Sequence, residues 1–166
     1  KSLHSAMIKE RKYIAPDVDS EGWFATGDIG RLKDGALYIE GRLKEVIVNE
    51  SGENVYPDEL EDYFLNLPDV KAFTVLGIRK NKNSAYEDIV IVCQLSESFE
   101  NTDKLEALRN EISFRNRALP VYKKLDYALI TNDDLPVSNG IKIRRVVIKR
   151  QAENGEGNFV KIEKLK

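Results

Sequence analysis

The pattern of apolar and polar residues becomes regular only after Gly41. The residues before it contain scattered glycines and a proline and show no strong periodicity, which is typical of irregular, turn-rich structure. From Arg42 onward, short apolar runs alternate with polar turns. This pattern predicts the order strand, helix, strand, strand, helix, strand, followed by a polar loop and a basic segment.

The first helix is expected to begin at Pro57, because proline lacks an N–H group and a helix does not need one at its first position. Asp58 and Glu59 follow, and their negative charge suits the positive end of the helix dipole. Pro68 should end the helix. The apolar residues of this segment recur at the helical spacing i, i+3, i+4, i+7: Leu60, Tyr63, Phe64 and Leu67.

A second helix should start near Asn101 or Thr102, either of which can cap it, and its apolar stripe is Leu105, Leu108, Ile112 and Leu119. Residues 89–93 are apolar at every position, so they should form a central strand that is covered on both faces. The other expected strands are residues 46–48, 70–78, 125–130 and, as an edge strand, 159–165. Residues 141–148 alternate basic and apolar side chains.

This order of elements predicts an α+β domain with a small mixed sheet and helices packed on it. Residues 1–42 differ in composition and are expected to be an irregular, β-rich end of another domain. Residues 43–150 are expected to form the compact domain, and residues 151–166 a tail extension.

Composition and charge exclude several classes of protein. Among 166 residues, 26 are Lys or Arg and 28 are Asp or Glu, which gives a net charge of −2. A dedicated nucleic-acid-binding domain usually carries a clear basic excess. No apolar run approaches the roughly 18 residues of a membrane-spanning helix, and the first residues lack the apolar core of a signal peptide. With a single cysteine, these features favour a reducing cytoplasm.

The single cysteine and the single histidine leave little room for metal or nucleophilic chemistry. Cys93 lies in the most apolar strand, so it is expected to be a small core residue. His4 lies near the N-terminus, where no partner for metal binding or for serine chemistry is evident. No metal site is therefore expected.

Three short segments contain side chains that could do chemistry, although each has an ordinary structural explanation. The first is Gly22–Gly30, where Asp28 follows Gly27. A carboxylate in such a turn can accept hydrogen bonds from a diol such as a ribose. On its own, the segment is more simply a surface turn in which Asp28 bonds to its own backbone.

The second segment runs from Gly41 through Arg42, Lys44 and Glu45 to the loop Ser51-Gly52-Glu53. Arg42 can fork onto a sugar or phosphate oxygen, and Gly52 lets a loop approach a ligand closely. A solvated charged surface before a helix explains the same residues.

The third segment, Leu135–Arg145, presents Lys142 just after a glycine-containing turn. A positioned ammonium there could stabilise the charge that develops on a carboxylate and a phosphate during reaction. The alternatives are a solvated basic hairpin, or a weak anion-binding patch formed by the cations between residues 142 and 150.

The order and spacing of these segments resemble the C-terminal portion of the adenylate-forming (AMP-binding) superfamily, and most closely its acyl-CoA synthetases, or long-chain fatty-acid–CoA ligases. The resemblance covers about residues 20–148. It rests on five ordered matches: Trp23-Phe24-Ala25-Thr26-Gly27-Asp28; Gly41-Arg42-Leu43-Lys44-Glu45; Gly52 with Val55-Tyr56-Pro57-Asp58-Glu59-Leu60-Glu61; Pro120-Val121-Tyr122-Lys123-Lys124; and Leu135-Pro136 with Lys142.

The resemblance implies an ATP-dependent ligase. Enzymes of this family convert a carboxylic acid and Mg-ATP into an acyl-adenylate and pyrophosphate, and then pass the acyl group to a thiol, usually that of CoA. The expected substrates are Mg-ATP, CoA and a carboxylic acid, most simply a fatty acid. A large N-terminal domain holds most of the nucleotide, magnesium and acid sites, and a small C-terminal domain rotates between the two half-reactions.

The resemblance also assigns roles to particular residues. Asp28 should bind the ribose hydroxyls of ATP, and Arg42 should touch the ribose at the domain boundary. Lys44 should be the hinge, and the loop Ser51-Gly52-Glu53 should border the path of the pantetheine arm of CoA. Lys142 should be the catalytic lysine of adenylation.

The chain departs from the family pattern in two ways. Ile141 separates Gly140 from Lys142, whereas the family places glycine directly before the lysine, so Lys149 and Lys123 are the next candidates. The glycine-rich phosphate loop and the acid pocket are not among the 166 residues. The chain is therefore expected to be a C-terminal fragment that supplies the hinge, ribose contacts and lysine, and that is inactive without the missing N-terminal domain.

Other functions stay open on the sequence alone. An adenylation enzyme that loads a carrier protein would share all the motifs. A non-catalytic interaction module could have kept the fold without its chemistry. A small nucleic-acid-binding domain would rely on the basic stretch after Lys142, and the net negative charge opposes it.

Overall fold

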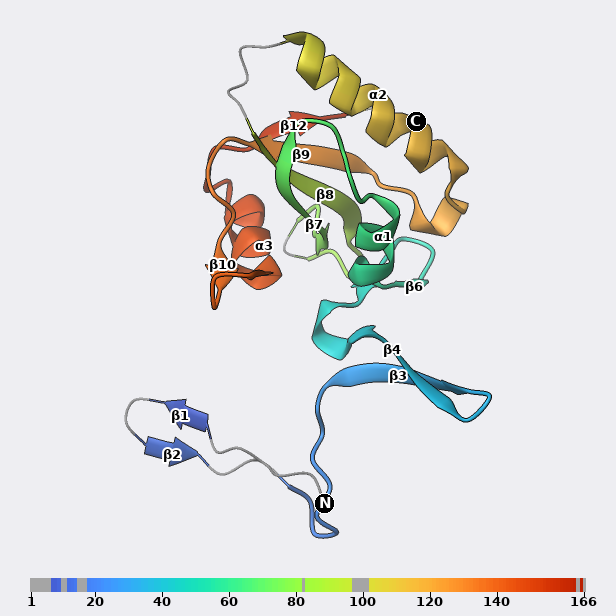
Figure 1. The fold of residues 1–166 in the computed structure, drawn as a ribbon, viewed down its shortest axis with the longest axis vertical. Coiled ribbons are helices and arrows are strands. Elements are labelled where there is room, and N and C mark those ends of the chain that lie inside the picture. Colours follow the sequence, from blue (N-terminus) through green and yellow to red (C-terminus); the bar gives the residue numbers. More distant parts are fainter. Residues whose placement is uncertain are drawn as a thin grey trace.

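A four-stranded sheet with helices on both faces forms the body of the protein (Figure 1). The structure, a computed structural model, describes residues 7–9, 12–14, 18–81, 83–96, 102–163 and 165. The strand order is β12-β9-β8-β7. The strands of the sheet are β7 (Val70–Ile78), β8 (Asp88–Leu95), β9 (Tyr127–Thr131) and β12 (Val160–Ile162), and the helices are α1 (Pro57–Tyr63), α2 (Thr102–Ala118) and α3 (Arg145–Asn154).

The sheet is mixed, as the sequence predicts. Strands β7 and β8 pair antiparallel, with Val75 opposite Ile91. Strands β8 and β9 pair parallel, which requires a long crossover between them, and α2 lies in that crossover. Strand β12 pairs antiparallel with β9 at the edge. The expected α+β architecture is therefore confirmed.

Strand β8 is buried along its whole length, and its alternating side chains enter two separate cores. Ile89, Ile91 and Cys93 belong to the first core, which also contains residues of α1 and α2. Val90 and Val92 belong to the second core, which α3 covers through Ile148. The prediction of a central strand covered on both faces is confirmed.

Helix α1 is shorter than expected. It ends at Tyr63, where the backbone N–H of Phe64 donates to the carbonyls of Leu60 and Glu61. Asn66 then adopts a left-handed conformation with φ 61°, which a continuing helix does not allow. The expectation that Pro68 ends the helix is therefore wrong by a full turn. Of the four stripe residues, Tyr63 is 41% exposed, and Leu60, Phe64 and Leu67 are buried.

Helix α3 is absent from the predicted order of elements. The sequence suggested only a basic segment over residues 141–148, because basic and apolar side chains alternate there. In the structure, a short hairpin of β10 (Val137–Ser138) and β11 (Lys142–Ile143) leads into α3, which Gly155 ends with φ 69°. Burial of Ile148 against the open face of the sheet decides in favour of the helix.

The C-terminal residues are part of the same body. The expected boundary between residues 150 and 151 falls inside α3. The β12 residues pair with β9, and Leu165 is fully buried in the first core. The sequence analysis placed both β12 and Leu165 in a tail extension.

Among the described residues before α1, the strands form three two-stranded sheets. Two of them, β1–β2 and β3–β4, lie outside the body in Figure 1, and the third, β5–β6, packs against it through Ile47 and Val55. The β3–β4 hairpin exposes Leu32, Leu37 and Ile39. Their bounds are β1 (Met7–Lys9), β2 (Lys12–Ile14), β3 (Asp28–Lys33), β4 (Ala36–Arg42), β5 (Ile47–Val48) and β6 (Asn54–Val55).

Cys93 is a core residue, as predicted. It is fully buried, and burial raises the pKa of its thiol to about 12, so the thiol is not a nucleophile at neutral pH. His4 lies outside the described residues. Within the described part of the chain, no helix is long and apolar enough to cross a membrane.

Asn116 is the buried polar residue that joins α2 to the end of the chain. Its side-chain amide donates to the carbonyls of Leu125 and Leu165 at 3.0 and 3.2 Å, and its Oδ1 accepts from the backbone N–H of Leu125 at 2.7 Å. All of these groups are buried, so each would lose its partner inside the core if the amide were removed.

We therefore expect Asn116→Ala to lower the free energy of unfolding by about 2–4 kcal/mol, because it leaves several buried polar groups unsatisfied. Urea denaturation followed by circular dichroism measures this loss. Asn154→Ala is the control, because the Asn154 side chain is exposed and, among the described residues, bonds only to Glu156. Equal stabilities for the two variants would contradict this role of Asn116.

Candidate functional site

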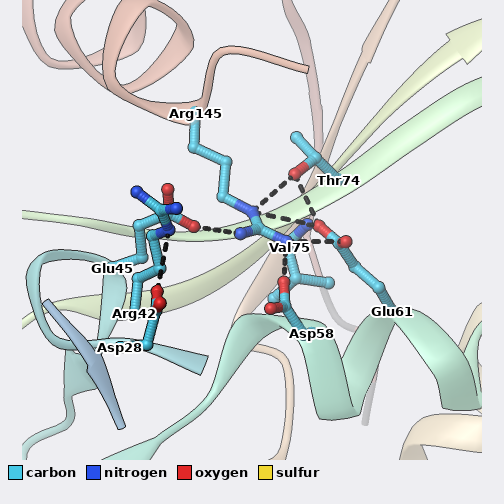
Figure 2. Close-up of polar contacts among 8 residues, drawn as sticks. All are labelled: Asp28, Arg42, Glu45, Asp58, Glu61, Thr74, Val75 and Arg145. Atoms are coloured by element: carbon cyan, nitrogen blue, oxygen red, sulfur yellow. Dashed lines mark hydrogen bonds and ion pairs between the residues drawn. The ribbon is translucent and has the colours of Figure 1, made fainter. Parts of the chain in front are cut away.

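Asp28 and Arg42, the two expected ribose contacts, lie opposite each other where β3 begins and β4 ends. Their Cα atoms are register partners, and the Nε of Arg42 lies 3.2 Å from an Oδ of Asp28 (Figure 2). The backbone N–H of Asp28 donates to the Thr26 hydroxyl at 3.1 Å, which orients the turn. Both charged side chains are partly exposed, so a hydroxyl-bearing ligand can reach them.

The expected hinge follows directly as a 3₁₀ helix, η1 (Leu43–Glu45). The backbone N–H of Leu43 donates to the carbonyl of Gly27 at 2.8 Å, which ties η1 to the base of the β3–β4 hairpin. Lys44 is exposed and has no ion pair within the described part of the chain. Lys44 and Glu45 line a cleft of about 290 Å³ together with Arg145 and Lys149 of α3.

The loop Ser51-Gly52-Glu53 connects β5 to β6, and one side chain organises it. The Oδ1 of Asn49 accepts from the backbone N–H groups of Ser51 and Glu53, both at 3.0 Å, and from the Ser51 hydroxyl at 2.8 Å. The Nδ2 of Asn49 donates to the carbonyl of Tyr122 at 2.7 Å. Gly52 has φ +76° and open space around it, so a ligand can approach its backbone closely.

A second cleft, of about 460 Å³, lies between this loop and the 3₁₀ helix η2 (Val121–Lys123). Its charged lining is mostly acidic, with Lys124 as the basic member: Glu50, Glu53, Glu87, Asp88 and Asp126. Burial raises the pKa of Asp126, and the charge of Asp88 acts in the same direction. Such a lining suits a neutral ligand better than a phosphate.

Lys142 lies on β11, opposite Ser138 of β10. Asn139 and Gly140 form the turn between them, with φ values of 51° and 72°, as expected for a tight hairpin turn. Ile141, the residue that separates the glycine from the lysine, is exposed, and its N–H donates to the carbonyl of Ser138 at 3.2 Å. The hairpin therefore accommodates the extra residue and still presents Lys142 to solvent.

The two alternative lysines are occupied by ion pairs. Lys123 pairs with Glu59, and Lys149 pairs with Glu87. Lys142 is exposed and pairs with no carboxylate in the described part of the chain. Of the three, Lys142 is the one whose ammonium can meet an anionic ligand without first breaking an ion pair.

The structure separates Lys142 from the loop at Gly52. Leu135 and Ile143, which flank the Lys142 hairpin, pack into the second core, on the face of the sheet covered by α3. Ile47 and Val55, which flank the loop, pack into the first core on the opposite face. Figure 1 shows the β10 hairpin beside α3 and the β5–β6 hairpin beyond α1.

Sequence reasoning gave no individual role to three residues that shape this region: Asn49, Glu45 and Arg145. It named Glu45 and Arg145 only as members of longer segments. Asn49 has a local signal, because an Asn two residues before a Ser-Gly pair is typical of an Asx turn. Glu45 and Arg145 have no local signal, because they meet across 100 positions of the sequence. Within the described residues, no group of three or more His, Cys, Asp or Glu side chains could hold a metal ion.

Comparisons with known proteins agree with this geometry. No family model matches the chain. The chain is 32% identical over 149 residues to the long-chain-fatty-acid–CoA ligase FadD13 of Mycobacterium tuberculosis. The match includes 87% of this chain but only 28% of the length of that relative.

Two solved structures extend the comparison. o-Succinylbenzoate CoA synthetase (MenE) from Bacillus subtilis, in complex with the acyl-adenylate OSB-AMP, is similar with a TM-score of 0.61 and 25% identity over 79% of this chain and 25% of that one. McyG A-PCP, complexed with phenylalanyl-adenylate, is similar with a TM-score of 0.66 and 26% identity over 83% of this chain and 21% of that one.

Both structural matches share the fold of this chain over a quarter or less of their own length, and both are complexes with an acyl-adenylate. The sequence match to a long-chain-fatty-acid–CoA ligase covers 87% of the chain. The chain therefore belongs to the adenylate-forming superfamily, and it corresponds to the C-terminal portion of the acyl-CoA ligases in that superfamily.

Proposed function

We propose that this chain is the mobile C-terminal part of an acid–CoA ligase. In the first half-reaction, a carboxylate oxygen attacks the α-phosphorus of ATP, which gives an acyl-adenylate and pyrophosphate. In the second, the CoA thiol attacks the acyl carbon and AMP leaves. Residues 1–42 would be the end of the large nucleotide-binding domain, and the residues after them would be the part that rotates.

One observation carries this proposal: Lys142 and the loop at Gly52 are anchored on opposite faces of one sheet. A single active site can meet both only if the body turns between the two half-reactions. Lys44, in the exposed η1 segment that links the body to the β3–β4 hairpin, is placed where such a rotation needs a flexible residue.

Each half-reaction would then use its own residues. In adenylation, Asp28 and Arg42 would hold the ribose, and the Lys142 ammonium would bridge the carboxylate and the α-phosphate, where negative charge develops. In thioester formation, the loop Ser51-Gly52-Glu53 would border the pantetheine arm. The acidic cleft beside the loop suits that uncharged arm and disfavours the CoA phosphates.

The proposed substrates are Mg-ATP, CoA and a carboxylic acid. The fatty-acid–CoA ligase relative favours a fatty acid as the carboxylic acid. The 166 residues alone should not complete adenylation, because the phosphate loop and the acid pocket are not among them. The localisation that we propose is the cytoplasm.

A second candidate differs only in the acceptor of the acyl group, which would be the thiol of a carrier protein. The structural similarity to the phenylalanyl-adenylate complex favours this candidate. Both candidates share the first half-reaction, so offering CoA and a phosphopantetheinylated carrier protein to the same enzyme distinguishes them.

We expect Lys142→Ala, in the full-length natural protein that contains these residues, to lower acid-dependent pyrophosphate release by about 10²–10³-fold, because a positioned cation no longer stabilises the transition state. Release is measured with Mg-ATP and a series of acids from acetate to palmitate. Lys149→Ala is the matched control and should retain activity. Release that survives Lys142→Ala but not Lys149→Ala would move the catalytic role to Lys149.

We expect Asn49→Ala to slow thioester formation by about 10–100-fold while adenylation changes by less than about threefold, because the loop at Gly52 loses the side chain that shapes it. Rapid mixing of acyl-adenylate with CoA measures the thioester step separately from pyrophosphate release. Asn154→Ala serves as the control for the amide-to-methyl change. Equal losses in both half-reactions of Asn49→Ala would contradict a role confined to the loop.

A further inference from the structure

Arg145 is the first residue of α3 and lies three positions after Lys142. Its guanidinium reaches α1 and β7: the Nε lies 3.2 Å from one oxygen of Glu61 and 3.1 Å from the Thr74 hydroxyl, and Nη2 lies 2.7 Å from the other oxygen of Glu61 (Figure 2). Glu61 also accepts hydrogen bonds from the Thr74 hydroxyl and the Val75 N–H. Arg145 is thus fixed to the body of the domain.

The same guanidinium also contacts the hinge segment. Nη1 pairs with Glu45, the residue directly after Lys44 in η1, and Nη2 pairs with Asp58 of α1. The Arg145 side chain is only 10% exposed and that of Glu45 only 20%, whereas that of Asp58 is 55% exposed. Water therefore screens the Asp58 pair more than the Glu45 pair.

Three carboxylates share one cation in this cluster. Burial alone would lower the pKa of Arg145, but the hydrogen bonds and charges of Glu61 and Asp58 outweigh it and raise the pKa above its usual value. Arg145 therefore stays charged. A lysine could not replace it fully, because a single ammonium cannot fork onto carboxylates from several directions at once.

A short and stiff connection joins Arg145 to Lys142. Strand β11 ends at Ile143, α3 begins at Arg145, and only Arg144 lies between them. The N–H of Arg144 donates to the carbonyl of Pro136 at 2.8 Å, which closes the base of the hairpin. The residue that meets η1 and the strand that carries Lys142 are therefore neighbours in the chain, separated by Arg144 alone.

We propose that the Glu45–Arg145 ion pair couples the hinge to Lys142, so that Arg145 and Glu45 are positioning residues for adenylation. The inference rests on the proposed function, because it takes Lys44 as the hinge and Lys142 as the adenylation lysine. While the pair holds, the orientation of η1 fixes where the Lys142 hairpin stands. Without the pair, Glu61 and Thr74 still hold Arg145, but η1 and the Lys142 hairpin can take several orientations relative to each other, and adenylation slows while thioester formation does not.

The test compares two substitutions, each of which neutralises one carboxylate that faces the Arg145 guanidinium. Glu45→Gln breaks the contact with the hinge, and Asp58→Asn breaks the contact with α1. Both are made in the full-length natural protein, and thermal unfolding confirms that each variant is folded. Adenylation is measured by pyrophosphate release, and thioester formation by adding CoA to preformed acyl-adenylate.

We expect Glu45→Gln to lower the kcat of adenylation by about 10–100-fold, with the KM for ATP and the rate of thioester formation within about threefold of wild type. Asp58→Asn should leave both half-reactions within about threefold. Arg145→Lys should behave like Glu45→Gln if it folds, because the ammonium cannot hold Glu45 and Glu61 together.

Suppose that the wild-type enzyme is active and the Lys142→Ala variant is not, so that the proposed function stands. Two results would then overturn the inference alone. One is an equal effect of Glu45→Gln and Asp58→Asn on adenylation. The other is a parallel loss of both half-reactions in Glu45→Gln, which would indicate a purely structural role. Absence of acid-dependent pyrophosphate release in the wild type would instead overturn the proposed function, and the inference with it.

Discussion

The complete burial of β8 is the constraint on which the rest of this structure depends. Its side chains alternate between two faces and are apolar on both, so exposing either face would leave a row of branched side chains in water, at a cost of about 1.5–3 kcal/mol for each. The chain therefore has to cover the sheet twice. Helices α1 and α2 cover one face and α3 covers the other, with Ile148 as its buried residue.

The covering of both faces of the sheet also determines where the candidate functional groups lie. The Lys142 hairpin is attached to the side of the sheet that α3 covers, and the loop at Gly52 is attached to the side that α1 covers. In the proposed function, the two candidate groups on opposite faces of the sheet are used one after the other. The apolar strand at the centre would then affect the order of the proposed steps, although it contains no reactive residue.

The polar counterpart of this core is the cluster around Arg145. Its ion pairs tie α3 to α1 and to η1, the segment that contains the expected hinge, and a hydrogen bond to Thr74 ties it to β7. A half-buried cation with three carboxylate partners is costly to assemble without good geometry, and it is costly to break once assembled. Such a cluster fixes relative positions more than it adds stability, which suits the rotation that we propose for this body.

The sequence by itself determined the four strands of the main sheet, the central position of residues 89–93, the start of α1 at Pro57 and the core role of Cys93, because each depends on local periodicity or on one residue type. It also placed Asp28, Arg42, Lys44 and Lys142 in order along the chain. It did not predict the strands of the β3–β4 and β10–β11 hairpins. Only the tertiary structure decided that residues 145–154 form a helix, because burial of Ile148 against the sheet outweighs the local pattern there. It also showed that α1 ends at Tyr63, shortly before Asn66 takes a left-handed conformation. Folding likewise decided that Glu45 meets Arg145 and that Lys142 lies apart from Gly52. The sheet brings the first pair together and holds the second pair apart, and the spacing of these residues in the sequence does not predict either outcome.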